Sequence, residues 1–190
     1  MNKYHKRFLN SFTSENIIGL FSRYNNAAKE ITESYGMFQA AKSVIKKIGD
    51  YLVIVVGDGC SPRTGAIFAY FTKAEVISVD PGFNLPHWYE HYDKQTRMGF
   101  EPQRLTVLKE KIEDVPIDCK EKPCLVLWPH SHADMLRTNI YNYPNRIDIA
   151  MPCCNPIPAE LMKLQHITYD DYNVLSPKRT IHIWGEENHE

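Results

Sequence analysis

The sequence YLVIVVGDGCSPRTG, residues 51–65, decides the fold. Its first six residues form an uninterrupted apolar run rich in β-branched side chains, which is typical of a strand buried on both faces of a parallel sheet. The turn that follows contains Gly57, Gly59 and Gly65, and glycine in such a turn permits positive φ angles and a close approach of the backbone to a ligand. The stretch therefore predicts a strand, a glycine-rich turn and a helix in succession.

Short apolar runs recur along the chain after this strand. They span residues 75–79, 105–108, 124–128 and 147–151. Most of them are separated by segments with helical potential, at residues 65–73, 86–94 and 133–141. Residues 112–123 are too few and too charged for a good helix, so we expect one reduced crossover there. Alternating strands and helices predict an open, doubly wound and mostly parallel sheet with helices on both faces.

The two ends of the chain carry different patterns. Residues 1–49 contain apolar positions at helical spacing, which predict one or two helices against an edge of the sheet, with Gly49 as the stop. Near the other end, HITYDDYNV and KRTIHIWG are strand-like runs close enough together to form an antiparallel hairpin. We therefore expect one domain over residues 1–190, with a helical extension at 1–49 and a Rossmann-like α/β core at 50–190.

A carboxylate follows the second predicted strand. Asp80 comes 22 residues after Asp58 of the glycine-rich turn. An acidic residue about 20 positions beyond such a turn is placed to accept hydrogen bonds from two ribose hydroxyls. The two features together predict a nucleoside-cofactor site. The alternative is an ordinary tight strand–helix turn, with Asp80 capping the next segment.

The turn GDGCSPRTG resembles the first motif of the class I S-adenosylmethionine-dependent methyltransferases, in which an acidic residue is commonly followed by spaced glycines. It departs from that motif because Asp58 lies between the first two glycines and Pro62-Arg63 occupy the middle. Five parallel strands closed by an antiparallel hairpin are also the arrangement of that superfamily. The resemblance implies a methyltransferase with S-adenosyl-L-methionine as cofactor. It implies these cofactor-binding residues: Gly57, Asp58, Gly59, Cys60, Gly65, Asp80, Pro81, Ile112 and Trp128.

Two departures from the family pattern affect the expected cofactor contacts. A guanidinium beside a sulfonium would be unfavourable, so we expect Arg63 to face solvent or the methionine carboxylate. Where the family often has an acidic residue near the adenine, this chain has Lys111 and Ile112. The adenine contacts are therefore expected to be mainly backbone and apolar.

The fourth and fifth predicted strands end in CLVLWPHSHADM and IDIAMPCCNPIP. Ligands of doubly wound sheets lie beyond the carboxyl ends of the strands, so both segments should face the glycine-rich turn. His130, His132 and Asp134 are therefore the candidate catalytic residues. An imidazole with a pKa near neutrality suits the deprotonation of a hydroxyl or amine that attacks the methyl group.

The same two segments resemble the tRNA uracil-2′-O-methyltransferases, which have a His-Ser-Asp-type turn and then Pro-Cys-Cys. The corresponding residues here are His130, Ser131, Pro152, Cys153 and Cys154. The resemblance makes a structured RNA, or a substrate presented by a partner protein, the first candidate methyl acceptor. A small molecule or a protein side chain is the second. From position alone, Cys153 and Cys154 are expected to be small packing residues at a strand end.

Two other functions fit some of the residues. HSHAD matches the beginning of the metallo-β-lactamase signature His-x-His-x-Asp-His, which would predict a zinc hydrolase, although Met135 replaces the last histidine. The departures at Arg63 and Lys111 also allow a methyltransferase-like binding or regulatory subunit without turnover. No metal is expected in either methyltransferase interpretation.

The composition bears on the class of the protein, its partners and its compartment. Hydrophobic residues at 43% and charged residues at 24% are ordinary globular values, and the formal charge of −1 neither favours nor excludes a nucleic-acid partner. The five cysteines include no C-x-x-C pair and do not predict a disulfide framework. No apolar run has the length of a membrane span or of a signal-peptide core, so we expect a cytoplasmic protein without a membrane partner.

Overall fold

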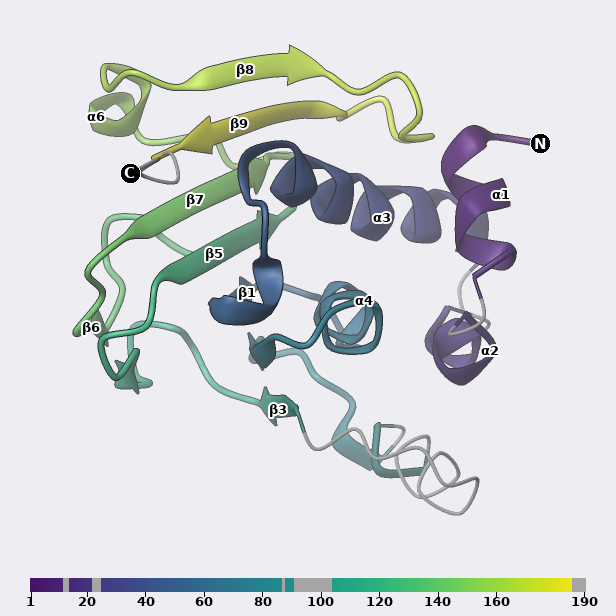
Figure 1. Cartoon of the computed structure of the whole chain (residues 1–190), viewed down its shortest axis with the longest axis horizontal. Coiled ribbons are helices and arrows are strands. Elements are labelled where there is room, and N and C mark those ends of the chain that lie inside the picture. The colour runs from purple at the N-terminus through teal and green to yellow at the C-terminus, as the bar shows by residue number, and fades with distance from the viewer. Residues whose placement is uncertain (12–13, 22–24, 87, 91–103, 186–190) are drawn as a thin grey trace.

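The computed structural model describes residues 1–11, 14–21, 25–86, 88–90 and 104–185. Its centre is a seven-stranded sheet with the order β3-β2-β1-β5-β7-β9-β8 (Figure 1). The strands of this sheet are β1 Leu52–Val56, β2 Glu75–Val79, β3 Leu105–Leu108, β5 Cys124–Pro129, β7 Arg146–Met151, β8 Ile167–Asp170 and β9 Thr180–Trp184.

The centre of the sheet is parallel, as predicted. β1 pairs in parallel with β2 on one side and β5 on the other, and all five of its residues are buried. Val53 and Val55 pack into the core on one face of the sheet, whereas Leu52, Ile54 and Val56 pack into the core on the other. This burial on both faces explains why the sequence of β1 is uninterrupted and apolar.

The predicted C-terminal hairpin is confirmed. β9 runs antiparallel to β7, and β8 runs antiparallel to β9 at the edge of the sheet. All four residues of β8 are exposed, whereas four of the five in β9 are buried. The parallel strands and this hairpin together give the predicted Rossmann-like α/β architecture.

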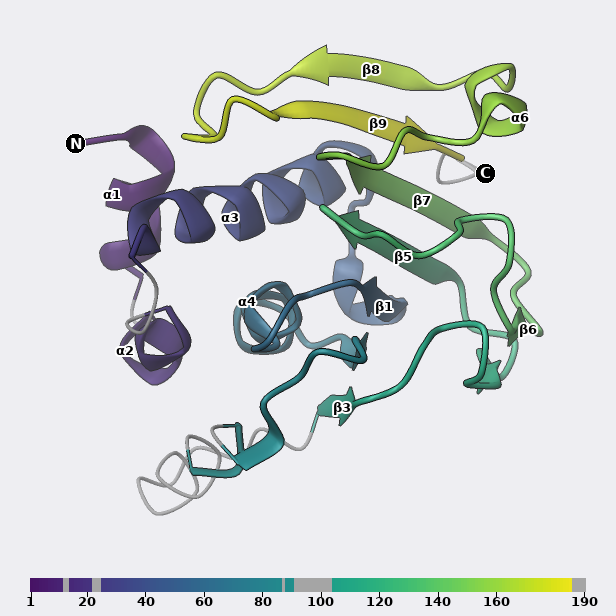
Figure 2. The same ribbon diagram turned by 180° about the vertical axis from the view of Figure 1, so that it is seen from behind.

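The helices are α1 Lys3–Leu9, α2 Ser14–Ile17, α3 Ala27–Val44, α4 Arg63–Phe71 and α6 Ala159–Met162, with 3₁₀ turns at Ile18–Leu20 and Ile48–Asp50. Their placement corrects one prediction. α3 does not lie at an edge of the sheet: it crosses the face of β5 and β7, beside α4 (Figures 1 and 2). Ten of its 18 residues are buried, which an edge position could not provide. α3 ends at Val44, before the predicted stop at Gly49, because Ile45 is extended and buried in the core.

Within the described part of the chain, little helix covers the opposite face of the sheet, where α6 packs through Leu161. Residues 133–141 do not form the predicted helix, because the backbone at Asn139 and Tyr141 accepts hydrogen bonds from residues 117 and 119 instead. Two short strands, β4 Ile117–Asp118 and β6 Ile140–Tyr141, result from this pairing. The crossover from β3 to β5 contains β4 and no helix, as expected. Of the predicted helix at 86–94, residues 86 and 88–90 are helical, and the others lie outside the described residues.

The N-terminal helices are tied to the C-terminal part of the chain. The Tyr4 hydroxyl donates to Asp171 Oδ2 at 2.5 Å, and Asn2 Nδ2 donates to the Asn173 carbonyl at 2.8 Å. Burial first, and then Asp171, raise the pKa of Tyr4, so this phenol stays protonated. Within the described part of the chain, no helix has the length and apolar character needed to cross a membrane.

Candidate functional site

The turn after β1 requires its first two glycines. Gly57 and Gly59 have φ angles of +81° and +78°, in the left-handed region that favours glycine. A Cβ on Gly57 would lie 2.8 Å from the Ser131 Cα, so the loop after β5 packs directly on this turn. The glycines therefore provide both the backbone conformation and the close approach of the two loops.

The Asp58 side chain stabilises the same turn through hydrogen bonds. Its buried carboxylate accepts hydrogen bonds from the amides of Thr64 and Gly65 and from the Ser78 hydroxyl, each at 2.9 Å. The two amides belong to the first turn of α4, so the carboxylate caps that helix. Burial raises the pKa of Asp58, although the hydrogen bonds from the two amides and the charge of Arg63 act in the opposite direction.

Asp80 follows β2, lies against the glycine-rich turn, and also caps the segment that follows it, as the alternative interpretation expects. Its Oδ2 accepts from the Gly59 amide at 2.8 Å, and its Oδ1 accepts from the Gly82 amide at 2.6 Å. These two bonds fix the carboxylate at the wall of a cavity. The structure thus brings together the turn and the acid that the sequence separates by about 20 residues.

The cavity has a volume of about 860 Å³, within the range of small-molecule and cofactor sites. It lies at the carboxyl ends of β1, β2 and β5, where doubly wound sheets bind ligands. Eight residues predicted for the site line it: Gly57, Asp58, Gly59, Asp80, Pro81, Ile112, His130 and His132.

The other four predicted site residues lie elsewhere. Trp128 and Asp134 border a separate, smaller cavity of about 250 Å³, and the Trp128 indole donates to Asp148 at 2.9 Å. Asp134 uses its carboxylate locally, to accept from the Leu136 amide and to pair with Arg137. Trp128 therefore lies away from the proposed cofactor position, and Asp134 does not support His130.

Gly65 and Cys60 complete the set. A Cβ on Gly65 would lie 3.1 Å from both Leu105 and Ser78, so this glycine permits close packing of α4 on the sheet. The Cys60 side chain is exposed, and its carbonyl accepts from the Asn84 amide at 2.9 Å. Both residues shape the turn from outside the cavity lining.

Arg63 does not face solvent, contrary to one part of the expectation. Its side chain is only 12% exposed, lines the cavity, and pairs with Glu30 of α3 at 2.6 Å. Its second guanidinium nitrogen donates to the Asp58 carbonyl at 3.3 Å. Because Glu30 balances the charge of Arg63, a cationic ligand in this cavity does not face an uncompensated guanidinium.

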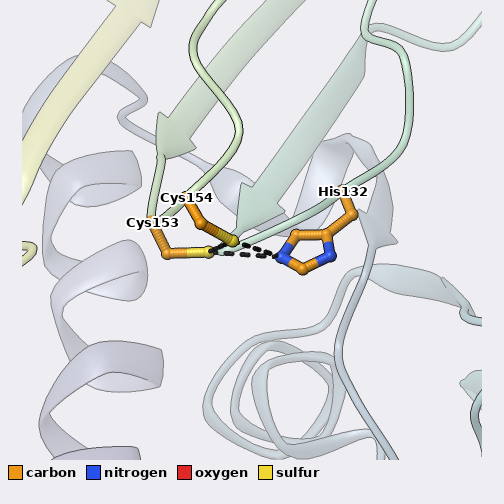
Figure 3. A group of neighbouring side chains, drawn as sticks. All are labelled: His132, Cys153 and Cys154. Carbon is orange, nitrogen blue, oxygen red and sulfur yellow. Dashed lines mark hydrogen bonds between the residues drawn. The ribbon is translucent and has the colours of Figure 1, made fainter.

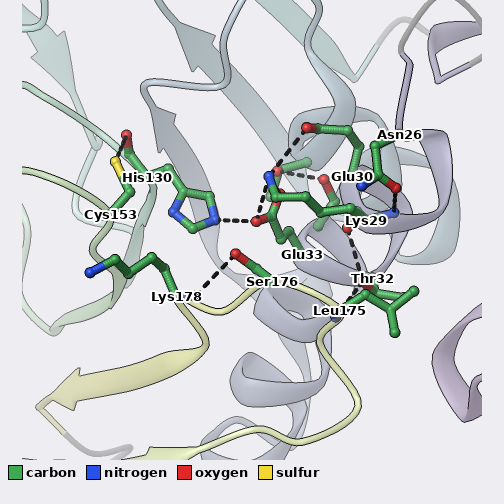
Figure 4. Close-up of polar contacts among 12 residues, drawn as sticks. Asn26, Lys29, Glu30, Thr32, Glu33, His130, Cys153, Leu175, Ser176 and Lys178 are labelled. Carbon is green, nitrogen blue, oxygen red and sulfur yellow. Dashed lines mark hydrogen bonds and ion pairs between the residues drawn. The ribbon is translucent and has the colours of Figure 1, made fainter.

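His130 immediately follows β5 and has an unusual backbone. Its φ angle is +53°, which is uncommon for a residue with a Cβ, and its amide donates to the Met151 carbonyl at 2.9 Å. Its Nε2 lies 2.7 Å from Oε1 of Glu33, on α3 (Figure 4). Non-glycine residues held in this region cluster at functional sites, where the surrounding structure keeps them in place.

Glu33 is a site residue that the sequence reasoning missed. Its side chain is 5% exposed and also pairs with Lys29, one helical turn away, at 3.0 Å (Figure 4). Burial alone would raise the pKa of Glu33, but the hydrogen bonds and charges of His130 and Lys29 lower it below its ordinary value. The only signal in the sequence was a Lys and a Glu at i,i+4 spacing within an apolar helix, which does not identify the histidine partner.

The HSHAD segment does not assemble the ligand set of the hydrolase interpretation. His130 pairs with Glu33, and the Asp134 carboxylate accepts from the backbone of its own loop. The His132 ring lies against Cys153 and Cys154 (Figure 3). His132 Nε2 lies 2.8 Å from the Cys154 Sγ and 3.5 Å from the Cys153 Sγ. The two cysteines are therefore not mere packing residues at a strand end: one is exposed and the other half-buried.

No protein-family model matches the chain, and no curated protein matches its sequence at a significant level. Solved structures do resemble it. One is a mutant of MtNAS in complex with S-adenosylmethionine, with a TM-score of 0.50 and 11% identity, covering 96% of this chain and 76% of that one. Another is an Aquifex aeolicus SAM-dependent methyltransferase, with a TM-score of 0.48 and 11% identity, covering 95% and 97%.

A third similar structure is a mutant 16S rRNA (adenine(1408)-N(1))-methyltransferase from Catenulisporales acidiphilia with its cosubstrate SAM. Its TM-score is 0.44 at 17% identity, covering 81% of this chain and 91% of that one. Likeness at such identities concerns the fold alone. The chain has the Rossmann-like fold of the class I S-adenosylmethionine-dependent methyltransferases, as its sequence predicted.

Proposed function

We propose that the chain is an S-adenosylmethionine-dependent methyltransferase, with RNA as the first candidate acceptor. The observation that carries the proposal is the wall of the larger cavity formed by Gly57, Gly59 and Asp80. Here a left-handed glycine turn meets a carboxylate fixed by two amides, at the carboxyl ends of adjacent parallel strands. This is the arrangement that receives a nucleoside in doubly wound sheets.

In this proposal, the ribose hydroxyls bind Asp80, and the adenine lies beside Ile112 and the backbone of Lys111. Ile112 is buried and lines the cavity, which suits an apolar contact with a base. The methionine end then extends toward Ser131 and His130, which line the same cavity beyond Gly57. Glu30 and Glu33, also in the lining, pair with Arg63 and Lys29, so neither of these two cations is left uncompensated near a sulfonium in this region.

His130 would act as the general base. Its Nε2 lies 2.7 Å from Glu33 Oε1, and its Nδ1 is buried without a hydrogen-bond partner among the described residues. In a neutral imidazole, one of these two nitrogens carries the lone pair that would accept the proton. A carboxylate that orients the imidazole and stabilises its protonated form is the usual support of a catalytic histidine. In this proposal Glu33 supports His130, and neither His132 nor Asp134 does.

RNA is proposed as the acceptor because of the resemblance to the tRNA ribose methyltransferases. The two segments that carry it lie side by side: the His130 amide donates to Met151, and Cys153 donates to the His130 carbonyl at 3.5 Å. A ribose hydroxyl presented to this junction would meet His130. Its deprotonation by a general base contributes on the order of 10²–10⁴-fold to the rate.

The test has two stages. Titration calorimetry should first detect S-adenosylmethionine and its demethylated product, and absence of both would overturn the proposal. Transfer of a labelled methyl group to size-fractionated cellular RNA should follow. Binding without transfer to RNA, small molecules or protein would leave a cofactor-binding subunit without turnover. Transfer to protein or to small molecules alone would replace RNA as the acceptor.

A further inference from the structure

The cluster of His132, Cys153 and Cys154 has no part in the proposed cofactor contacts. The side chains come from the loops that follow β5 and β7, and they converge on one point (Figure 3). β5 and β7 are parallel neighbours, with Pro129 opposite Met151, so their loops emerge at the same edge of the sheet. The two Sγ atoms lie 3.3 Å apart, and both are within 3.5 Å of His132 Nε2.

The loops are held in place around this cluster. Asn155 Nδ2 donates to the His132 carbonyl at 2.9 Å, so the residue after the two cysteines anchors the backbone of the histidine. On the other side, the His130 amide donates to Met151 at 2.9 Å. These hydrogen bonds hold the backbones of the two loops together, and so keep the three side chains near one another.

We propose that His132, Cys153 and Cys154 form a metal site, and that its metal is zinc. One imidazole nitrogen and two sulfurs are ligands that zinc prefers, whereas calcium and magnesium require oxygen. In a tetrahedral zinc site, ligand atoms lie about 3.6 Å apart for an S–N pair and about 3.8 Å for an S–S pair, from bond lengths of about 2.3 Å and 2.0–2.1 Å. The observed separations of 2.8, 3.5 and 3.3 Å would have to open by about 0.8, 0.1 and 0.5 Å to admit the ion, which rotation of the side chains can supply.

Three protein ligands leave the fourth position of a tetrahedral ion open. His132 and Cys153 both line the larger cavity, so an ion bound here would stand at its margin. His132 and Cys154 are exposed, which gives the ion a path of entry from solvent. Zinc sites with three protein ligands and one open position bind water or substrate and lower the pKa of the bound group.

The open position gives the site a role in methyl transfer that rests on the proposed function. A hydroxyl or thiol of the acceptor bound to the ion would lose its proton more readily and become a better nucleophile. The binding of zinc by the three side chains does not rest on it. A chain that binds zinc but no S-adenosylmethionine would overturn only the proposed function.

The first experiment uses the full chain, purified under reducing conditions and without cofactor. Elemental analysis after equilibration with zinc and removal of excess should find about one zinc per chain. Replacement by cobalt should give the near-ultraviolet sulfur-to-cobalt bands and the visible absorption of a tetrahedral site. His132→Ala, Cys153→Ser and Cys154→Ser should each weaken cobalt binding roughly tenfold or more.

Two matched variants control for loss of any thiol or imidazole. Cys60→Ser removes another exposed cysteine, and His166→Ala removes a half-buried histidine outside both cavity linings, so both should keep the cobalt spectrum. Circular dichroism confirms that each variant is folded. No cobalt–sulfur band in the wild-type chain, or one unchanged in all three cluster variants, would overturn the site.

A second measurement needs no variant. Zinc should protect Cys153 and Cys154, but not Cys60, from alkylation by iodoacetamide, as read by peptide mass spectrometry. Equal alkylation with and without zinc would overturn the proposal. So would finding Cys153 and Cys154 joined to each other under reducing conditions, because their sulfurs would then be unable to bind the ion as thiolates.

Discussion

The turn after β1 and the loops after β5 and β7 border the same cavity, but they are built differently. The turn is mainly backbone: Gly57 and Gly59 adopt left-handed conformations, and Asp80 is held by amides. The loops present side chains, with His130 held by Glu33 of α3. One half of the site is therefore specified within some 30 residues, whereas the other requires elements about 100 residues apart.

This difference has a consequence for mutation. Changes in the backbone-built half should act on folding and on cofactor affinity together, because the same atoms serve both. Changes in the side-chain-built half should act on the rate of transfer with little effect on cofactor affinity, because a base acts in the transition state. Single substitutions, measured for both stability and transfer rate, therefore separate the two halves.

The largest effect is expected at His130. His130→Ala should lower the single-turnover rate of methyl transfer by about 10²–10⁴-fold and change S-adenosylmethionine affinity by no more than about twofold. Because a Cβ at positive φ is itself unfavourable, His130→Asn is the matched variant: asparagine tolerates this conformation but cannot serve as a base. Rapid-quench kinetics and calorimetry provide the two measurements. If the asparagine variant kept the wild-type rate, His130 would not be the base.

Gly57 and Gly59 test the contact between the two halves. Gly57→Ala should lower the free energy of unfolding by roughly 2–4 kcal/mol, because alanine disfavours φ +81° and its Cβ would overlap the Ser131 backbone. Gly59→Ala has the same backbone penalty, but its Cβ would meet only the flexible end of Arg63. It should cost about 1–2 kcal/mol. Urea unfolding measures both, and equal losses would show that the contact with Ser131 is unimportant.

Asp80 tests the nucleoside contact. Asp80→Ala should weaken S-adenosylmethionine binding by about 1–3 kcal/mol, through loss of hydrogen bonds to a charged acceptor and of the support for the Gly59 amide. Asp50→Ala removes an exposed carboxylate near the opposite end of β1 and should leave binding unchanged. Calorimetry compares the three proteins. Equal affinities of the wild type and Asp80→Ala would show that Asp80 does not contact the nucleoside.

The backbone-built half was accessible from the sequence because its signals are local. Each feature can be recognised within a short stretch of sequence: the buried strand, the glycines that need positive φ, and the acid at the end of the next strand. The C-terminal hairpin was accessible for the same reason. Trp128 was misplaced because the pattern of β5 does not reveal which of its faces borders the cavity.

The side-chain-built half was less accessible because it depends on tertiary packing. Helical periodicity gave α3 an apolar stripe, but not its position across β5 and β7, and so not the pairing of Glu33 with His130. Residues 133–141 have helical potential, which the pairing of β6 with β4 overrides. His132 was found from its spacing, but its partners Cys153 and Cys154 lie more than 20 residues away, in the next strand's loop.

The smallest effect concerns Glu33 and its pH dependence. Its partners His130 and Lys29 lower its pKa below the ordinary value of 4.5, so below that pH the unfolded chain binds more protons at this position than the folded chain does. The stabilisation is therefore present above pH 4.5 and is lost as the pH falls through the folded pKa. Glu33→Gln keeps an acceptor without the charge, so it should destabilise the fold by on the order of 1 kcal/mol near neutral pH. Urea unfolding from about pH 7 to about pH 3 should show this difference shrinking below pH 4.5.

Glu160→Gln, exposed on α6, controls for the loss of a surface charge. A difference between wild type and Glu33→Gln that stayed constant across this range would show that the charge of Glu33 does not support His130, and that the two halves of the site differ less than their geometry implies.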